Sequence, residues 1–316
     1  MQKRFLARVF SLILIASLMF AFGCENAGIG QKKTGIVKEE IYSGTKGLEM
    51  KFLDNLPPSK LYDTASLDIV AELYNRGIYD LNNQNCILHL HGFDSNIFRG
   101  LDRNKFCGDM KAKSIEYFQG EKNTVEFKTD TIELMEGIDH FPQKFVITAC
   151  YDYQTIATPV VCVDPTYYRV TAVKGACTAK DVSLAGGQGA PVAVTRVGVN
   201  MMGQDKVSFE IDIKNVGGGN VLRNGIDLYN TCPHNINYED YDIVEYDINM
   251  GKATRVRCAP EIEGAPRVRL TNGEARIICS FSVSEENAYT TPLDIWLGYS
   301  YMDSISKSVE IIKTPG

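Results

Sequence analysis

The sequence lacks several features that would identify an activity. It has only four histidines and one tryptophan. It has no Cys-x-x-Cys pair, and no second apolar run is long enough to span a bilayer as a helix. No Gly-x-Ser-x-Gly, His-Glu-x-x-His or Gly-x-x-x-x-Gly-Lys-[Ser/Thr] motif occurs. The usual signatures of zinc knuckles, hydrolases, metalloproteases and nucleotide-binding loops are therefore missing. We expect no enzyme activity, no catalytic residue and no cofactor.

Positive charge is also in short supply. The formal net charge is −6, and setting aside the three basic residues of the first 23 residues takes it to −9. Phosphate contacts to nucleic acid need a concentrated basic face, and so does electrostatic binding to anionic lipid. We therefore expect no nucleic-acid partner.

The N-terminus has the pattern of an export signal. Three basic residues within the first eight precede an apolar run over residues 9–22, which ends at Gly23-Cys24. The run is short for a hydrocarbon core of about 30 Å. We expect residues 1–23 to be a lipoprotein-type signal peptide, Cys24 the lipidated mature N-terminus, and residues 24–44 a flexible tether. The alternatives are an uncleaved anchor and ordinary secretion, and all three place the body outside the cytoplasmic membrane.

Eight further cysteines lie 12 or more residues apart. An even number in an exported chain predicts up to four disulfides, with buried free thiols as the alternative. Local spacing favours Cys150 with Cys162, across a hairpin, and Cys232 with Cys258. We expect no bridge to be needed between the two halves of the chain. The eight candidates are Cys86, Cys107, Cys150, Cys162, Cys177, Cys232, Cys258 and Cys279.

Two patterns occur twice. Residues 67–77 and 207–217 each have four apolar residues at period two, closed by Asn-x-Gly. Residues 145–153 and 293–301 share a second alternating pattern that ends in Tyr-x-Tyr. Period two indicates half-buried strands, and Asn and Gly favour the turns that end them. Because both matches keep the same order, we interpret them as an internal duplication.

Short alternating segments fill both copies, and helical periodicity is weak. This pattern predicts an all-β fold of two tandem antiparallel β-sandwiches. We expect the sandwiches to span residues 45–172 and 192–316, with residues 173–191 as a linker that allows limited hinge motion. A short helix is expected over residues 109–119 and a strand over 225–230.

The strand closed by Asn-x-Gly, the strand expected next (residues 86–91 and 225–229) and the late Tyr-x-Tyr strand resemble the immunoglobulin-like modules of prokaryotic surface proteins. The adhesion-related type called CARDB is the nearest. The resemblance implies two immunoglobulin-like sandwiches that act as a stalk, spacer, adhesion or protein-binding module. The chain departs from the common pattern in being rich in cysteine.

His89 and His91 stand two residues apart in an expected strand. Residues i and i+2 of a strand share a face, so the two imidazoles could hold one metal ion. The interpretation we favour buries Leu88 and Leu90 and leaves both histidines in solvent. The other two histidines carry no site signature.

Residues 237–247 contain five acidic residues and three tyrosines. Such a density of carboxylates could bind Ca²⁺, although the order of an EF-hand loop is missing. The segment could instead contact a partner through Tyr238, Tyr241 and Tyr246, since tyrosine is enriched in interfaces. The third alternative is a solvated loop that leads into a strand. We also expect structural tyrosines at a sheet edge in both Tyr-x-Tyr pairs, and a core position for Trp296.

Together these features predict a membrane-anchored extracytoplasmic protein of the cell envelope that binds, adheres or scaffolds without catalysis. Its expected partners are the membrane, through an N-terminal lipid, and an unidentified envelope protein or glycan. The alternative is a metal-dependent binding protein or enzyme that uses His89 and His91.

Overall fold

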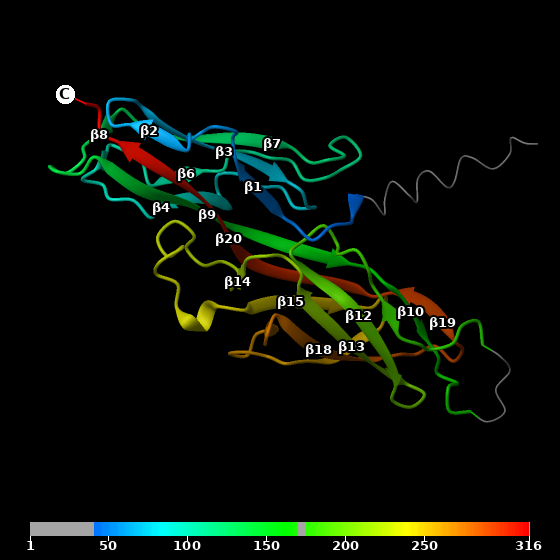
Figure 1. The fold of residues 1–316 in the computed structure, drawn as a ribbon. Coiled ribbons are helices and arrows are strands. Elements are labelled where there is room, and N and C mark those ends of the chain that lie inside the picture. Colours follow the sequence, from blue (N-terminus) through cyan, green and yellow to red (C-terminus); the bar gives the residue numbers. More distant parts are fainter. Residues whose placement is uncertain (1–40, 170–174, 316) are drawn as a thin grey trace, which may run out of the picture. The chain divides into compact units, whose positions relative to one another are not determined.

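The computed structural model describes residues 41–169 and 175–315 (Figure 1). They form an all-β fold of mainly antiparallel sheets, with one short 3-10 helix, η1 (Tyr238–Asp240). Within these ranges no helix is long and apolar enough to cross a membrane. The expected signal peptide, Cys24 and most of the tether lie outside the described residues.

Three sheets contain most of the strands. The first has the order β1-β3-β7, with β1 (Leu48–Phe52), β3 (Leu67–Asn75) and β7 (Lys122–Thr129). The second has the order β11-β12-β13-β18-β16, with β11 (Val182–Ser183), β12 (Val192–Met201), β13 (Lys206–Asn215), β18 (Glu274–Ser282) and β16 (Thr254–Ala259). The third has the order β17-β15-β20-β9-β4-β6, with β17 (Arg267–Arg269), β15 (Ile243–Asn249), β20 (Asp294–Ile312), β9 (His140–Ala157), β4 (Cys86–His91) and β6 (Asn104–Phe106).

The remaining strands are short. Strands β14 (Asn220–Leu222) and β2 (Lys60–Tyr62) add to β20 and complete an eight-stranded sheet. Two small sheets pair β10 (Val160–Val163) with β19 (Tyr289–Pro292) and β5 (Phe98–Arg99) with β8 (Thr131–Ile132).

The period-two alternation sends one face of each repeated strand into the core. In β3, Leu67, Ile69 and Leu73 are fully buried, and in β13 Val207 and Phe209 are too. Each such side chain contributes about 1.5–3 kcal/mol relative to an exposed position. The strands predicted over residues 67–74 and 206–214 are therefore confirmed.

The repeated sequence patterns meet in space. The Tyr301 hydroxyl accepts the Gly219 N–H at 2.8 Å and donates to Asn215 Oδ1 at 3.1 Å. Asn215 also accepts the Gly217 N–H at 3.2 Å, which closes the turn. A Cβ at residue 217 would lie 2.3 Å from the tyrosine oxygen, so only glycine fits there. The Tyr-x-Tyr strand is thus docked on the Asn-x-Gly turn.

The first half contains the same arrangement. Asn75 Oδ1 accepts the Gly77 N–H at 3.3 Å, and the Tyr153 hydroxyl accepts the Tyr79 N–H at 3.4 Å. A Cβ at residue 77 would lie 1.7 Å from that hydroxyl oxygen. The matching contacts agree with the repeat in the sequence.

The other tyrosine of each pair connects two sheets. The Tyr151 hydroxyl accepts the Leu48 N–H at 3.3 Å, and the Tyr299 hydroxyl accepts the Val192 N–H at 3.2 Å. Burial raises the pKa of both phenols well above the usual value, so they stay neutral. These tyrosines are structural, but they lie in the middle of the eight-stranded sheet rather than at the expected edge.

Their central position follows from the pairing of β9 with β20, which extends from Ala157↔Ile295 to His140↔Ile312 (Figure 1). Strands of both halves therefore share one sheet, and Ile41–Gly316 groups as one compact unit. The strands expected over residues 293–301 and 307–312 are one continuous strand.

The described part of the expected linker is hydrogen-bonded on both sides. The Gln188 side chain donates to the Val194 carbonyl at 3.2 Å and accepts the Val194 N–H at 2.8 Å. Gly189 donates its N–H to the Gly44 carbonyl at 3.0 Å and accepts the Ile78 N–H at 3.2 Å. These bonds tie the end of the segment to the first half of the chain.

Two local expectations are wrong. Residues 109–119 form no helix, because their backbone N–H groups bond to partners outside a helical turn. Lys111 donates to the Glu121 carboxylate and Lys113 to the Gly77 carbonyl, both at 2.8 Å. Trp296 is half-buried rather than in the core, and its indole N–H donates to Gln154 at 2.8 Å.

All eight cysteines of the described chain form disulfides, as predicted. Four disulfides indicate an oxidising, extracytoplasmic environment. The pairs are Cys86–Cys107, Cys150–Cys232, Cys162–Cys177 and Cys258–Cys279.

The two expected pairings, Cys150 with Cys162 and Cys232 with Cys258, are wrong. Cys150 lies on the face of β9 that is turned away from the core, where a loop from the second half brings Cys232 to it. That bridge connects residues expected in separate sandwiches, so the expectation of no bridge between the halves also fails.

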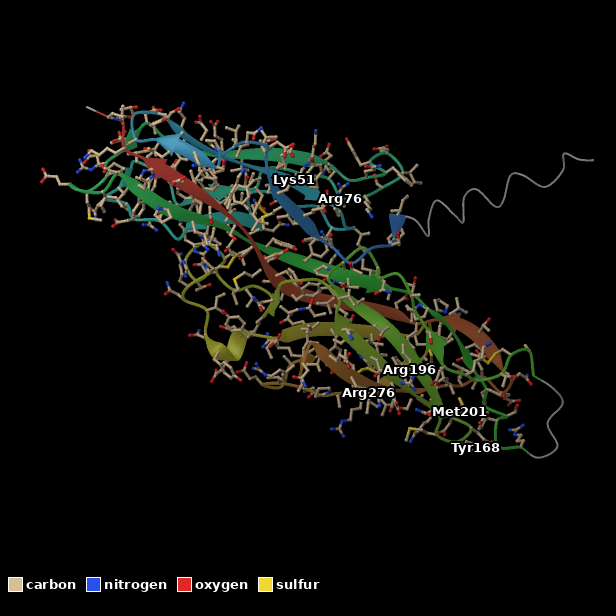
Figure 2. The ribbon with its side chains drawn as sticks, viewed as in Figure 1. Lys51, Arg76, Tyr168, Arg196, Met201 and Arg276 are labelled. Carbon is tan, nitrogen blue, oxygen red and sulfur yellow. A yellow bond between two sulfur atoms is a disulfide. The ribbon has the colours of Figure 1, made fainter. Side chains whose placement is uncertain are left out.

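Surface charges on the five-stranded sheet are largely paired. Arg196 and Arg276 lie on this sheet (Figure 2) and flank Asp212, at 2.9 and 2.6 Å. Arg196 also pairs with Asp181 at 2.7 Å. Exposed pairs of this kind contribute about 0–1 kcal/mol each, so they matter more for neutralising charge than for stability.

Candidate functional site

The outer face of the eight-stranded sheet carries the side chains that β4 turns away from the core. Leu88 and Leu90 are buried in the core, as expected, so His89 and His91 project from the opposite face. Residues 223–237, which we call the covering loop, pass over this face between β14 and η1. The site is the space between the covering loop and the sheet.

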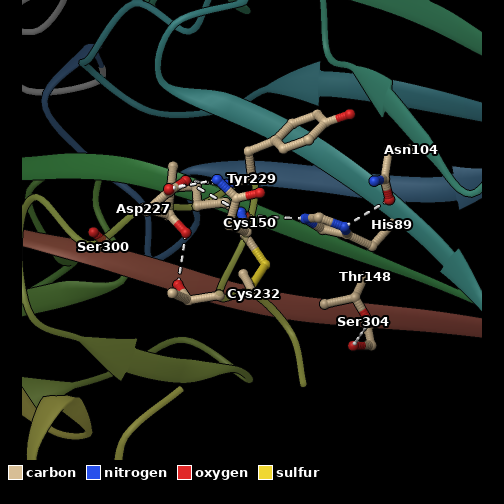
Figure 3. The surroundings of a disulfide bond; sticks show 12 residues. His89, Asn104, Thr148, Cys150, Asp227, Tyr229, Cys232, Ser300 and Ser304 are labelled. Atoms are coloured by element: carbon tan, nitrogen blue, oxygen red, sulfur yellow. Dashed lines mark hydrogen bonds between the residues drawn. A yellow bond between two sulfur atoms is a disulfide. The ribbon is translucent and has the colours of Figure 1, made fainter. Parts of the chain in front are cut away.

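Three contacts hold the covering loop in place. The Cys150–Cys232 disulfide links it to β9 (Figure 3), and Leu228 packs with Ile87 and both cysteines. The Leu228 carbonyl also lies 3.2 Å from His89 Nε2. The loop is therefore fixed to the sheet by a covalent bond, a small apolar cluster and a buried hydrogen bond.

The strand expected over residues 225–230 is absent, because the segment folds as a turn of the covering loop. Asp227 Oδ1 accepts the N–H groups of Tyr229 and Asn230, both at 3.1 Å, and its backbone carbonyl accepts the Thr231 N–H at 2.9 Å. These local bonds compete with strand pairing and set the direction of the loop.

His89 is buried at the site, with 5% of its surface exposed. Its Nε2–H donates to the Leu228 carbonyl, and its Nδ1 lies 2.9 Å from the Asn104 side-chain amide. The Asn104 atom that faces Nδ1 is the amide oxygen, Oδ1, which can only accept. Because a neutral imidazole carries one proton, it can donate to only one of these two oxygens at a time. Burial lowers the pKa of His89, so the neutral form is favoured.

His91 and His234 complete a cluster of three histidines. His91 Nε2 lies 2.8 Å from the Thr148 hydroxyl, which lies 2.7 Å from that of Ser304. The rings of His91 and His234 meet edge to face, with centroids 4.9 Å apart. Burial lowers the pKa of His91, and the neighbouring charge of His234 lowers it further. The sequence placed no site at His234, and only the fold brings it here.

The cluster does not supply a ready set of metal ligands. His89, Cys150 and Cys232 form the one group of potential ligands found among the described residues, with ligand atoms within 4.8 Å of one another. Both sulfurs belong to the disulfide, and both nitrogens of His89 have hydrogen-bond partners. The placement of His89 and His91 on one face is confirmed. The expected exposure of His89 is wrong, because the covering loop buries it.

A cavity of about 210 Å³ lies between the covering loop and the sheet, beside the Cys86–Cys107 disulfide. Its wall combines amides, carboxylates, apolar groups and two aromatic rings, and it contains no Lys, Arg or His. The lining residues are Asn83, Gln84, Cys86, Ile87, Phe106, Asp152, Ile226, Asp227, Leu228 and Tyr229.

Phe106 and Tyr229 form an aromatic rim on this cavity. They are 52% and 51% exposed, and their ring centroids lie 6.2 Å apart. Phe106 directly precedes Cys107, and Tyr229 stands three residues before Cys232. Each ring is thus fixed close to a disulfide that ends on the eight-stranded sheet. A rim held in this way loses little conformational entropy when it binds.

Asp152 supplies the acidic part of the cavity wall. Its Oδ1 accepts a hydrogen bond from the Ser300 hydroxyl at 2.6 Å, while no Lys or Arg in the described chain pairs with it. Burial raises the pKa of Asp152, and the bond from Ser300 opposes the shift. The second carboxylate of the wall, Asp227, lies on the opposite side of the Cys150–Cys232 disulfide from His89 (Figure 3).

The three tyrosines expected to contact a partner have different environments. Tyr238 is 86% exposed, and Tyr241 is half-buried. Tyr246 is 1% exposed, and its hydroxyl donates to the Pro260 carbonyl at 2.6 Å. The expectation is therefore wrong for Tyr246, because the alternation of β15 turns this side chain into the core.

The acidic residues of segment 237–247 do not converge on one point. Three of them form ion pairs, and no group of three carboxylates with adjacent oxygens occurs among the described residues. The calcium alternative therefore lacks a gathered ligand set. The pairs are Asp240 with Arg223, Glu245 with Arg267 and Asp247 with Arg255.

Sequence reasoning missed Phe106, Asp152 and Tyr229. The available signal was an aromatic residue within three positions of a cysteine, since a disulfide fixes such a ring near the protein surface. No comparable signal marks Asp152, which is one acid among the alternating residues of a long strand.

No known family model matches the sequence, and no match is found among curated proteins.

Proposed function

We propose that this chain is an exported, membrane-anchored protein of the cell envelope that binds a protein or glycan partner without catalysis. The observation that carries the proposal is the aromatic rim, Phe106 and Tyr229, held half-exposed beside two disulfides. Exposed aromatic residues on a rigid support are the usual anchors of interfaces.

The fold supports a binding role through its rigidity. Disulfides and the long pairing of β9 with β20 limit the motion of the sheet behind the rim. In this proposal each half of the chain is an immunoglobulin-like sandwich related to the CARDB type. Cys24 carries the lipid that anchors the chain to the membrane.

The covering loop extends the contact surface beyond the rim. Tyr238 begins η1 immediately after the loop and is 86% exposed. Tyr229 and Tyr238 therefore present two aromatic side chains on one fixed segment, with Phe106 beside the first. A partner that contacts both the rim and η1 would desolvate all three rings.

The test is chemical crosslinking in cells that export the protein. We expect Tyr229→Ala to reduce capture of the partner at least fivefold, since the central aromatic anchor is lost. Tyr62→Ala is the matched control, because Tyr62 is 54% exposed on β2. Equal capture by both variants and the unaltered protein would refute a contact through the rim.

Anchorage is tested separately. Cys24→Ala should leave the protein unprocessed or release it from the membrane fraction. Unchanged processing and membrane association of this variant would contradict the lipid anchor.

A further inference from the structure

Asp152 lacks the countercharge that most acids on the strands have. Most acids in contact with the sheets pair with Lys or Arg, as Glu72 does with Lys51 at 2.9 Å. Asp152 is partly buried and is hydrogen-bonded to a neutral hydroxyl only. A carboxylate withdrawn from water is costly unless it is neutralised or paired. The cavity therefore lacks a positive group at Asp152.

We propose that this cavity binds an organic cation, an ammonium or guanidinium group, between the aromatic rim and Asp152. The inference rests on the proposed binding function and names the chemistry that the site recognises. Asp227, on the covering loop, adds a second negative charge to the wall.

The aromatic rim fits the same ligand. A cation placed over an aromatic face is attracted by the negative face of the ring, most strongly where the cation is desolvated. The molecule already uses such contacts, with the Arg76 guanidinium 4.7 Å from the Tyr74 ring centroid and that of Arg103 4.6 Å from Phe93. The described residues place no cation over Phe106 or Tyr229.

The size of the cavity restricts the ligand. At about 210 Å³ it is smaller than the pockets of about 300–1,000 Å³ that enclose drug-sized molecules. It suits one extended side chain or a small free amine. A sugar ring would stack on the rim equally well, but it would leave Asp152 without a countercharge.

The probes are n-butylguanidinium and n-butylammonium, with n-butanol as the neutral analogue of similar shape. Binding to the intact, oxidised protein is followed by NMR chemical shifts or calorimetry at neutral pH. We expect the two cations to bind, with n-butanol at least tenfold weaker. Equal binding of all three probes, or no binding of the cations, would overturn the inference.

The decisive variant is Asp152→Asn, with Asp294→Asn on the exposed part of β20 as the control. Asparagine keeps the shape and can still accept the Ser300 hydrogen bond. Because burial disfavours the charged form of Asp152, the variant should unfold at an equal or higher temperature than the unaltered protein. We expect it to bind n-butylguanidinium at least tenfold more weakly, whereas Asp294→Asn binds normally. Unchanged binding by Asp152→Asn would overturn the inference.

Two sources of the cation can be separated with a short peptide that contains one Arg, compared with its Gln version. Tighter binding of the Arg peptide than of n-butylguanidinium assigns the site to a side chain of a protein partner. Equal binding assigns it to a free amine or guanidine, and both outcomes support cation recognition.

Failure of this inference is distinguishable from failure of the proposed function. If the cations do not bind but capture in cells still depends on Tyr229, only the ligand chemistry is wrong. If the cations bind but capture does not depend on Tyr229, the contact surface is wrong and the cavity remains a cation site.

Discussion

Removing the Cys150–Cys232 disulfide should destabilise the protein and release the covering loop. The perturbation is the double variant Cys150→Ala/Cys232→Ala, which leaves no unpaired thiol. The matched control is Cys258→Ala/Cys279→Ala, which removes a bridge within the five-stranded sheet, away from the aromatic rim.

The magnitudes follow from loop length. A disulfide lowers the entropy of the unfolded chain and so raises the free energy of unfolding. For residues separated by 82 positions the gain is about 4.5 kcal/mol at 25 °C, and for a separation of 21 it is about 3.3 kcal/mol. The Cys162–Cys177 bridge lies inside the longer loop and shortens it, so the contribution of the Cys150–Cys232 disulfide falls to about 4.4 kcal/mol. We expect the free energy of unfolding to fall further in the Cys150/Cys232 variant.

The assay is urea unfolding of the three oxidised proteins, with the slope checked for two-state behaviour. Binding of n-butylguanidinium is measured on the same samples in the absence of urea. We expect binding to be lost in the Cys150/Cys232 variant and retained in the control. Greater destabilisation of the control, or retained binding without the Cys150–Cys232 bridge, would refute the reasoning.

Two further predictions concern the repeat contacts and the histidines. Gly217→Ala should cost several kcal/mol because its Cβ would lie 2.3 Å from the Tyr301 hydroxyl oxygen. Tyr301→Phe should cost about 1–3 kcal/mol through the unsatisfied Gly219 N–H. In urea unfolding, the double variant Gly217→Ala/Tyr301→Phe should lose less stability than the sum of the two single losses. Strictly additive losses would contradict the contact between Gly217 and Tyr301. His89 has a lowered pKa when folded, so the unfolded chain binds more protons and the free energy of unfolding should fall as pH drops below 6.5. His89→Gln should flatten this decline in unfolding experiments between pH 7 and 5, and an unchanged slope would count against the buried neutral imidazole.

The sequence predicts the repeated strands and their faces well because these depend on local alternation. Leu88 and Leu90 were expected in the core and are found there. The Asn-x-Gly turn and the Tyr-x-Tyr strand are separate motifs in the sequence, and neither motif indicates that they dock through Tyr301 and Gly217. Alternation determines which face a residue occupies, but it does not indicate which distant residue it meets.

The parts that could not be predicted depend on contacts between distant segments. His89 was expected in solvent, but Leu228, 139 residues later, covers it. The correct partner of Cys150 is Cys232 at a separation of 82 residues, whereas local spacing favoured Cys162. The alternating pattern of residues 225–230 predicted a strand, but the Asp227 carboxylate bonds locally and its apolar neighbours cover the sheet instead.

The most direct test of the proposed contact surface is site-specific photo-crosslinking in exporting cells. A photoreactive residue is placed in turn at position 229, on the aromatic rim, and at position 62, which is equally exposed on β2. We predict one crosslinked partner species from position 229 that is absent from position 62 and disappears when Cys150→Ala/Cys232→Ala is added. The same crosslinked species from both positions, or its persistence without the disulfide, would contradict a partner held by the fixed aromatic rim.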